Sequence, residues 1–223
     1  YATENGLNKY DPLANRFNAI KLDEVPGCGT EQGLSNLMAV NDTWWVGTAD
    51  RGVLVLDSSG KKLLKSIVPG TISKQNESNY INAFGQSKAG EVLIGTFIGA
   101  FTCNTQTFQT KIIQSLASEK ILAILTNSRT ASYWFATNNG IKILAADLKT
   151  LQNTILDGIT VNCLYQQKNG IIWIGTSKGL YSWEDNKLYK TAQNSEAYSI
   201  MANARIYSLS EDGAGNLLIA SSS

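Results

Sequence analysis

A short phrase recurs along this chain and constrains its fold more than any other feature of the sequence. The phrase combines a small residue, a threonine and a glycine at nearly fixed spacing, as in Gly175-Thr176-x-x-Gly179-Leu180. Its hydroxyl-bearing markers are Thr3, Thr48, Thr96, Thr137, Thr176 and Ser221. These markers are roughly 40–50 residues apart, a spacing typical of repeated β units. The sequence therefore predicts an array of small β units and not one irregular domain.

Each repeat contains the same succession of strand and turn signals. An apolar run, such as residues 121–124, is followed by a polar turn and by a second, more continuously apolar run, such as residues 133–135. The lack of polar alternation in the second run indicates a strand in a sheet that is packed on both faces. The glycine of the phrase then begins a third strand. A weaker fourth strand is expected around Phe17, Leu63, Phe108, Leu151 and Leu188.

Four short antiparallel strands with two apolar faces must stack on neighbouring units, and a radial array provides this stacking. We therefore expect an all-β fold over residues 1–223, a β-propeller built of four-stranded antiparallel blades with about five repeats. The apolar runs at 81–84, 121–124 and 161–164 are expected to be innermost. Five blades could close on themselves, with the final sheet borrowing strands near 7–10 and 17–20. Alternatively the chain is part of a larger propeller, and its exposed edge strands would then pair with another copy.

Composition and charge exclude several classes of partner. The formal net charge is +1 and the lysines and arginines are scattered, so no nucleic-acid binding is expected. No apolar run approaches the roughly 18–20 residues that a bilayer-spanning helix needs, so this segment is not expected to insert into a membrane. Cys28, Cys103 and Cys163 are widely spaced, which favours separate thiols over one disulfide and gives no metal-site spacing. No cofactor or metal is expected.

Residues 170–183 read Gly-Ile-Ile-Trp-Ile-Gly-Thr-Ser-Lys-Gly-Leu-Tyr-Ser-Trp, and this stretch resembles the repeat of the two-component regulator propeller family. The match is also close at residues 45–52 and looser where Leu93 and Leu218 replace the tryptophan. The resemblance implies an extracytoplasmic, periplasmic sensor propeller of a bacterial hybrid two-component system. It also implies a carbohydrate-like ligand and a histidine kinase region elsewhere in the same parent protein.

The residues offer little chemistry for catalysis. Histidine is absent, which removes the commonest general base and metal ligand. The carboxylate pairs at 23–24, 184–185 and 211–212 are adjacent in sequence, so on a strand they point to opposite faces. A propeller glycosidase or lyase would need a converging acid and base, for which only Glu4 and Asp50 are candidates. The glycine-rich stretch at 27–30 and the serines at 221–223 are interpreted as loop. We expect no enzyme activity.

The tryptophans are interpreted mainly as packing residues. Trp45, Trp134 and Trp173 occupy one repeated position in the second strand, where a core role is expected. Trp44 and Trp183 lie outside that repeated position. The Trp183 ring is expected to be partly exposed and to pack in the core or at the rim of the sheet.

Loops on one face of a rigid propeller are the expected binding surface. The turns between second and third strands carry varied residues, and the starts of the first strands add others. The candidate ligand-binding residues are Arg51, Tyr80, Phe97, Asn139, Lys178 and Arg205, which we expect to surround one channel mouth. The leading hypothesis is a non-catalytic sensing propeller that binds an oligosaccharide or other small solute, or docks a sensor domain. The alternatives are a protein-interaction scaffold, including a homodimer, and the enzyme described above.

Overall fold

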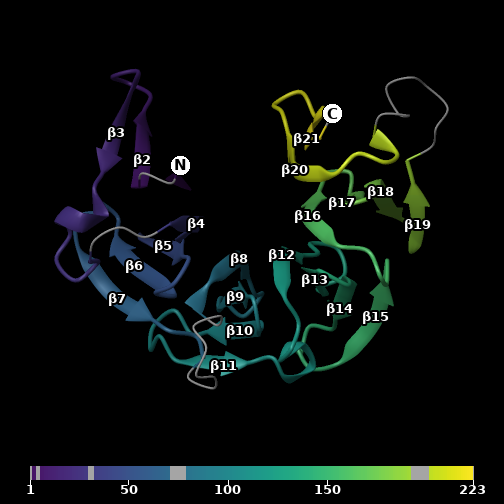
Figure 1. The fold of residues 1–223 in the computed structure, drawn as a ribbon, viewed down its shortest axis with the longest axis horizontal. Helices are drawn as coiled ribbons and strands as arrows, with labels where there is room; N and C mark the ends of the chain where they lie inside the picture. The colour runs from purple at the N-terminus through teal and green to yellow at the C-terminus, as the bar shows by residue number, and fades with distance from the viewer. Residues whose placement is uncertain (1, 4–5, 30–32, 71–78, 192–200, 223) are drawn as a thin grey trace. The chain divides into compact units, whose positions relative to one another are not determined.

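The computed structural model describes residues 2–3, 6–29, 33–70, 79–191 and 201–222. The chain divides into two compact units, Tyr1–Ser118 and Glu119–Ser223. Each unit is built from antiparallel sheets of consecutive strands (Figure 1). The prediction of an all-β fold is confirmed, because the helical segments among the described residues are short 3₁₀ turns such as η1 (Leu22–Glu24) and η3 (Gln114–Leu116).

The first unit contains three sheets, called A, B and C, whose strands follow chain order. Sheet A has three strands and sheets B and C have four each. Their bounds are β1 (Ala2–Thr3), β2 (Gly6–Asp11) and β3 (Arg16–Ile20) in sheet A; β4 (Leu34–Val40), β5 (Thr43–Thr48), β6 (Val53–Asp57) and β7 (Leu63–Ile67) in sheet B; β8 (Ile81–Gln86), β9 (Val92–Thr96), β10 (Gly99–Cys103) and β11 (Thr110–Ile112) in sheet C.

The second unit contains sheets D, E and F. Sheets D and E are four-stranded, and sheet F has two strands. Their bounds are β12 (Ile121–Thr126), β13 (Tyr133–Thr137), β14 (Gly140–Leu144) and β15 (Leu151–Ile155) in sheet D; β16 (Val161–Gln166), β17 (Ile172–Thr176), β18 (Gly179–Glu184) and β19 (Lys187–Lys190) in sheet E; β20 (Ile206–Glu211) and β21 (Leu217–Ser221) in sheet F.

One predicted fourth strand lies elsewhere than expected. The strand of sheet C is β11, which begins two residues after Phe108. Phe108 itself has a φ of 57° in the turn that precedes β11. Its ring lies 6.1 Å from the ring of Trp45. The apolar character of Phe108 therefore reflects packing from a turn and not a strand position.

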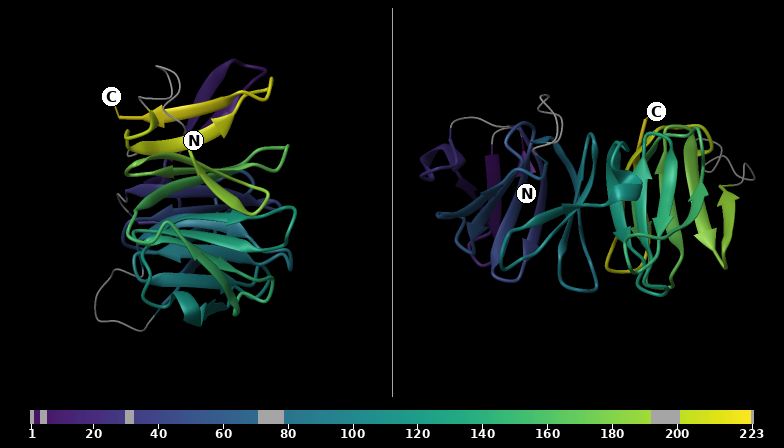
Figure 2. Two further views of the ribbon diagram at one scale, coloured as in Figure 1. Left: turned by 90° about the vertical axis from the view of Figure 1, so that its right-hand side faces the viewer. Right: turned by 90° about the horizontal axis from the view of Figure 1, so that it is seen from below.

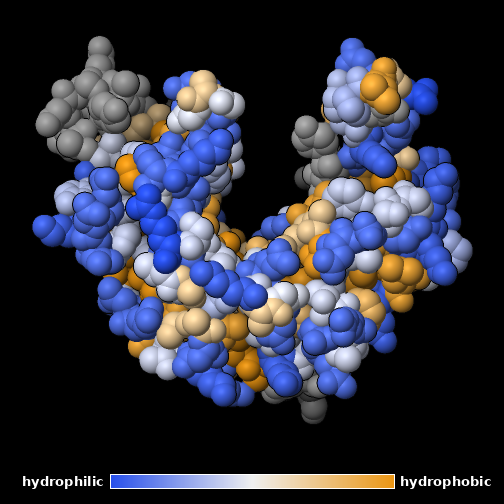
Figure 3. All heavy atoms as spheres, turned by 180° about the vertical axis from the view of Figure 1, so that it is seen from behind, coloured by the Kyte–Doolittle hydropathy of each residue, from blue (hydrophilic) through white to orange (hydrophobic). Residues whose placement is uncertain are grey.

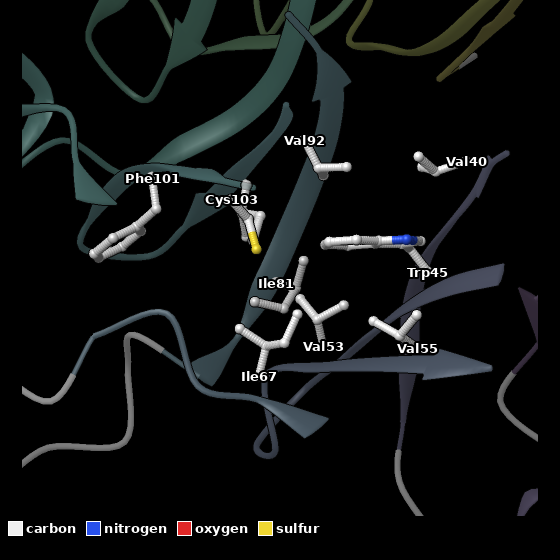
Figure 4. Close-up of a cluster of buried hydrophobic side chains, with 10 residues drawn as sticks. Val40, Trp45, Val53, Val55, Ile67, Ile81, Val92, Phe101 and Cys103 are labelled. Carbon is white, nitrogen blue, oxygen red and sulfur yellow. The ribbon is translucent and has the colours of Figure 1, made fainter. Parts of the chain in front are cut away.

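The second strands of sheets C and D, β9 and β13, are buried along their whole length, as their continuous apolar runs predict. Neighbouring sheets within a unit pack face to face through these strands (Figure 2). Between sheets B and C, Trp45 is 1% exposed and lies among Val40, Val55 and Val92 (Figure 4).

The first strands of neighbouring sheets lie beside one another within each unit. Strand β4 contacts β8, β12 contacts β16, and β16 contacts β20. This is the arrangement of inner strands in stacked propeller blades, as predicted. All five first strands have a register shift near their start, between the first and third residues. A β-bulge at this point inserts one residue and turns its side chain away from the regular pleat.

The recurring threonine explains why the phrase is repeated. The hydroxyl of Thr176 donates to the carbonyl oxygen of Gly179 at 2.7 Å and accepts from the Lys178 N–H at 3.0 Å. Thr48, Thr96 and Thr137 make equivalent pairs of hydrogen bonds, and all four threonines are fully buried. Gly179 has a φ of +112°, and a Cβ there would lie 2.3 Å from the Ala202 carbonyl oxygen. The threonine and glycine together fix this turn.

The glycine that precedes Thr48 has a different role. A Cβ on Gly47 would lie 2.9 Å from the Ile81 side chain of the next sheet. Gly175 similarly faces Ile206 of sheet F, at 2.6 Å. The small residue therefore allows the first strand of the next sheet to approach closely.

One face of the molecule is mainly polar. On the face shown in Figure 3, hydrophilic residues predominate and hydrophobic residues form small, separated groups. Among the described residues there is no helix with the length and apolar character needed to cross a bilayer.

Candidate functional site

The candidate site lies at one edge of the sheets, which we call the threonine-turn edge. It comprises the turns between second and third strands and the residues just before the first strands. In the first unit, the Gly52 N–H donates to the Asn79 carbonyl oxygen at 3.0 Å. This bond joins the turn of sheet B to the start of sheet C, so the two groups of residues share one edge.

Tyr80 and Phe97 are the predicted site residues that contact each other directly. Their rings are stacked, with centroids 4.2 Å apart and an interplanar angle of 9°. Tyr80 immediately precedes β8, and Phe97 lies in the β9–β10 turn. Both side chains are partly exposed. The pair therefore presents a rigid aromatic surface at the threonine-turn edge.

Asn79, the residue before Tyr80, has a buried side-chain oxygen. This Oδ1 atom has no hydrogen-bond partner among the described residues. Asn79 was not selected from the sequence, because an asparagine before a strand is an ordinary turn residue.

Arg51 contacts the loop that precedes β4. Its Nη1 donates to the Cys28 carbonyl oxygen at 3.0 Å, and its guanidinium occupies the space where a Cβ on Gly29 would lie. The side chain thus crosses the glycine-rich loop, which is confirmed as a loop, while Cys28 packs beneath it with Leu7 and Val46. Arg51 is at the predicted edge, but this hydrogen bond holds its guanidinium on the loop.

In the second unit, Asn139 also makes local contacts. Its Nδ2 donates to Asp157 Oδ1 at 3.2 Å, and its Oδ1 accepts from the Gly158 N–H at 2.8 Å. Lys178 is exposed in the β17–β18 turn. Arg205 precedes β20, and its guanidinium carbon lies 5.4 Å from the centre of the Tyr207 ring. All three residues lie at the threonine-turn edge of their own sheets.

Tyr207 was not selected from the sequence, although it forms an exposed cation–π pair with Arg205. It is 54% exposed and is the extra residue in the bulge of β20. The apolar run around it indicates a strand but cannot show which residue the bulge turns outward.

The carboxylates are dispersed among turns. Glu4 and its neighbour Asn5 lie outside the described residues, and Asp50 is exposed in its turn. Glu24 accepts from Lys21 Nζ at 2.7 Å. The Asp212 carboxylate accepts a hydrogen bond from the Asn216 side chain and others from backbone N–H groups of its own turn, and these bonds hold its pKa below the ordinary value. Among the described residues, no group of three His, Cys, Asp or Glu residues could hold a metal.

The three cysteines are free thiols, as favoured by their spacing. Burial raises the pKa of Cys103 to about 12 and that of Cys163 to about 11. Burial also raises the pKa of Cys28, although Arg51 opposes this shift. The thiolate is the nucleophilic form. At neutral pH these cysteines are therefore protonated packing residues.

The tryptophans pack in the core to different extents. Trp134 is 2% exposed and packs edge to face with Trp183, with ring centroids 5.4 Å apart. Trp183 is half-buried in the same cluster, as predicted. Trp173 is only partly buried, although it was expected to be core, and it packs with Leu217 and Ile219 of sheet F.

Residues 155–178 match the two component regulator propeller family. They run from the end of β15 to the turn that contains Lys178. None of the curated protein sequences matches this chain.

Several solved structures are similar to the chain. The extracellular domain of BT4673 from B. thetaiotaomicron, described in one structure as a one component system and in another as a hybrid two component system, has a TM-score of 0.77 in both. The identities are 17% and 18%, and the matches cover 99% of this chain but only 30% and 29% of those chains. This chain thus spans less than a third of their length.

Two further structures have the same fold at lower similarity. The extracellular domain of the hybrid two component system BT3049 from B. thetaiotaomicron has a TM-score of 0.69 at 20% identity, over 97% of this chain and 30% of that chain. An ancestral GH74 enzyme has a TM-score of 0.63 at 12% identity, over 84% of this chain and 27% of its own. This chain therefore has an all-β propeller fold, and its residues 155–178 match the two component regulator propeller family.

Proposed function

We propose that this chain is a non-catalytic sensing propeller in the periplasmic region of a bacterial two-component sensor. Its ligand is an oligosaccharide or a similar polyhydroxylated solute, bound at the threonine-turn edge. The signal passes to a histidine kinase region of the same parent protein. The family match at residues 155–178 and the similarity to extracellular sensor domains support the sensor role.

The stacked pair of Tyr80 and Phe97 is the single observation that carries the ligand class. Aromatic rings present a flat apolar surface, and the weakly polar C–H face of a sugar ring can lie against such a surface. A neutral ligand also suits a chain with a formal net charge of +1.

Ligand binding is tested by thermal denaturation of the purified chain in a panel of oligosaccharides. A ligand that binds only the folded state raises the melting temperature, by an amount that grows with concentration. The expected result is a dose-dependent rise with at least one oligosaccharide. In Phe97→Ala the affinity should fall about tenfold, which corresponds to the loss of one aromatic contact.

Tyr189→Ala is the matched control. Tyr189 is 48% exposed on β19 and lies away from the threonine-turn edge. Its replacement should leave the oligosaccharide affinity unchanged. An equal loss in both variants, or binding by peptides but by no oligosaccharide, would contradict the proposed ligand class. The second result would favour the interaction-scaffold hypothesis.

A further inference from the structure

The turn between β5 and β6 carries two charged side chains, Asp50 and Arg51, at the threonine-turn edge. Arg51 is already engaged, because its Nη1 donates to the Cys28 carbonyl oxygen at 3.0 Å and its guanidinium lies over Gly29. Asp50 is exposed, and its carboxylate makes no hydrogen bond or ion pair with another residue that the structure describes. The charge that this turn leaves for a ligand is therefore negative.

The backbone on both sides of Asp50 is fixed. The Ala49 N–H donates to the Gly33 carbonyl oxygen at 2.9 Å. The Arg51 N–H donates to the Thr48 hydroxyl, also at 2.9 Å. Asp50 thus stands on a rigid position, so a ligand that binds its carboxylate does not have to order the loop first.

The same turn is joined to the segment that carries the stacked rings. The Gly52 N–H donates to the carbonyl oxygen of Asn79, the residue before Tyr80, at 3.0 Å. Along this path, standard backbone dimensions place the Cα atoms of Asp50 and Tyr80 at most about 12 Å apart. A ligand of two or more sugar units can span this distance and contact both residues.

The rings and the carboxylate suit different parts of one ligand. The rings of Tyr80 and Phe97 offer an apolar surface. An ionised carboxylate accepts hydrogen bonds but donates none, so it needs donors such as hydroxyl groups, and it repels anions. A free arginine would favour the opposite ligand, one that carries a carboxylate or phosphate group. Because Arg51 is bound to the loop, the site favours a neutral ligand over an acidic one.

We propose that Asp50 determines the ligand specificity of this site. Its carboxylate accepts hydrogen bonds from hydroxyl groups of a neutral oligosaccharide whose ring lies on Tyr80 and Phe97, and it excludes acidic sugars. This inference rests on the proposed function and names the class of sugar. It also assigns the charged ligand contact of this turn to Asp50 and not to Arg51.

Isothermal titration calorimetry with defined tetrasaccharides tests this assignment. The neutral probes are maltotetraose, cellotetraose, mannotetraose and xylotetraose, and the acidic probe is tetragalacturonate. At least one neutral probe should bind the wild-type chain, and tetragalacturonate should not. For the tightest neutral probe, Asp50→Ala should weaken the affinity about 10- to 100-fold, because hydrogen bonds to a charged group are lost. Asp50→Asn keeps one acceptor oxygen and should weaken it less.

Asp42→Ala is the matched control. Asp42 is exposed in the turn between β4 and β5, at the opposite edge of the same sheet, so its replacement should leave the affinity unchanged. If Phe97→Ala weakens binding and Asp50→Ala does not, the role of Asp50 is overturned while the proposed function stands. An equal loss in Asp42→Ala would also overturn that role. Failure of every neutral probe would contradict the proposed ligand class and this inference with it.

The exclusion of acidic sugars gives a second measurement that does not depend on lost hydrogen bonds. Asp50→Asn removes the negative charge, so tetragalacturonate should bind this variant more tightly than the wild-type chain, whereas the neutral probe binds it more weakly. The two affinities should thus change in opposite directions. Wild-type binding of tetragalacturonate as tight as that of the neutral probe, or no gain in Asp50→Asn, would overturn the role of Asp50.

Discussion

The hydroxyl of Thr137 provides the sharpest test of the turn mechanism. It donates to the Gly140 carbonyl oxygen at 3.1 Å and accepts from the Asn139 N–H at 2.9 Å. The residue is completely buried. Thr137→Val keeps the β-branched shape but removes both hydrogen bonds. A net hydrogen bond contributes about 0.5–1.5 kcal/mol, and a buried group left unpaired costs about 1–3 kcal/mol. We therefore expect a loss of about 2 kcal/mol in the free energy of unfolding.

Urea denaturation measures this loss. Thr137→Ser keeps the hydroxyl and loses a methyl group, so it should cost only about 1 kcal/mol. Thr154→Val is the control, because Thr154 is only partly buried on the outer strand β15, and its cost should stay within about 0.5 kcal/mol. The reasoning is refuted if Thr137→Val costs no more than Thr154→Val, or if Thr137→Ser is the more damaging change at this site.

Three further predictions concern packing, backbone conformation and pH. Trp45→Ala should cost about 3–5 kcal/mol in urea denaturation. Trp173→Ala should cost clearly less, because Trp173 is only partly buried, and equal costs would contradict this. Gly179→Ala should destabilise far more than Gly90→Ala, since both have positive φ but only Gly179 faces a backbone oxygen where the Cβ would lie; similar melting temperatures would refute the clash. Hydrogen bonds from the Thr150 and Lys149 N–H groups lower the pKa of Asp147 from 3.8 to about 2. Its contribution to stability is therefore present above pH 4 and lost as the pH falls toward 2. The stability difference between wild type and Asp147→Asn should shrink over that range, and a constant difference would refute the shift.

The strands could be predicted because they follow one repeated pattern. The continuous apolar run at 133–135 required burial on both faces, and every residue of β13 is buried. The fourth strand of sheet C was predicted around Phe108, which instead lies in the turn before β11. A single apolar residue looks the same in the sequence whether it belongs to a strand or to a turn that packs on the core. The partial exposure of Trp173 could not be predicted from its residue type, because it depends on the residues of sheet F that pack with the ring.

The candidate site was less predictable than the strands. Tyr80 and Phe97 were selected separately, and their stacking depends on the geometry of two different chain segments. Arg51 was selected for its charge, but whether its guanidinium points outward or binds the Cys28 carbonyl depends on the loop beside it. The common channel mouth for all six predicted residues stays a prediction.

The threonine turn suggests why the residues at this edge can vary without loss of the fold. In the four phrases that the structure describes in full, the threonine hydroxyl binds backbone atoms only: the carbonyl of the glycine and the N–H of the residue before it. The residue that donates this N–H is Arg51, Ile98, Asn139 or Lys178. Its backbone is fixed by the repeat, whereas the side chain contributes nothing to that bond. Four different side chains are therefore held on equivalent, rigid backbone positions, which is the separation of scaffold from variable loop that a recognition edge requires.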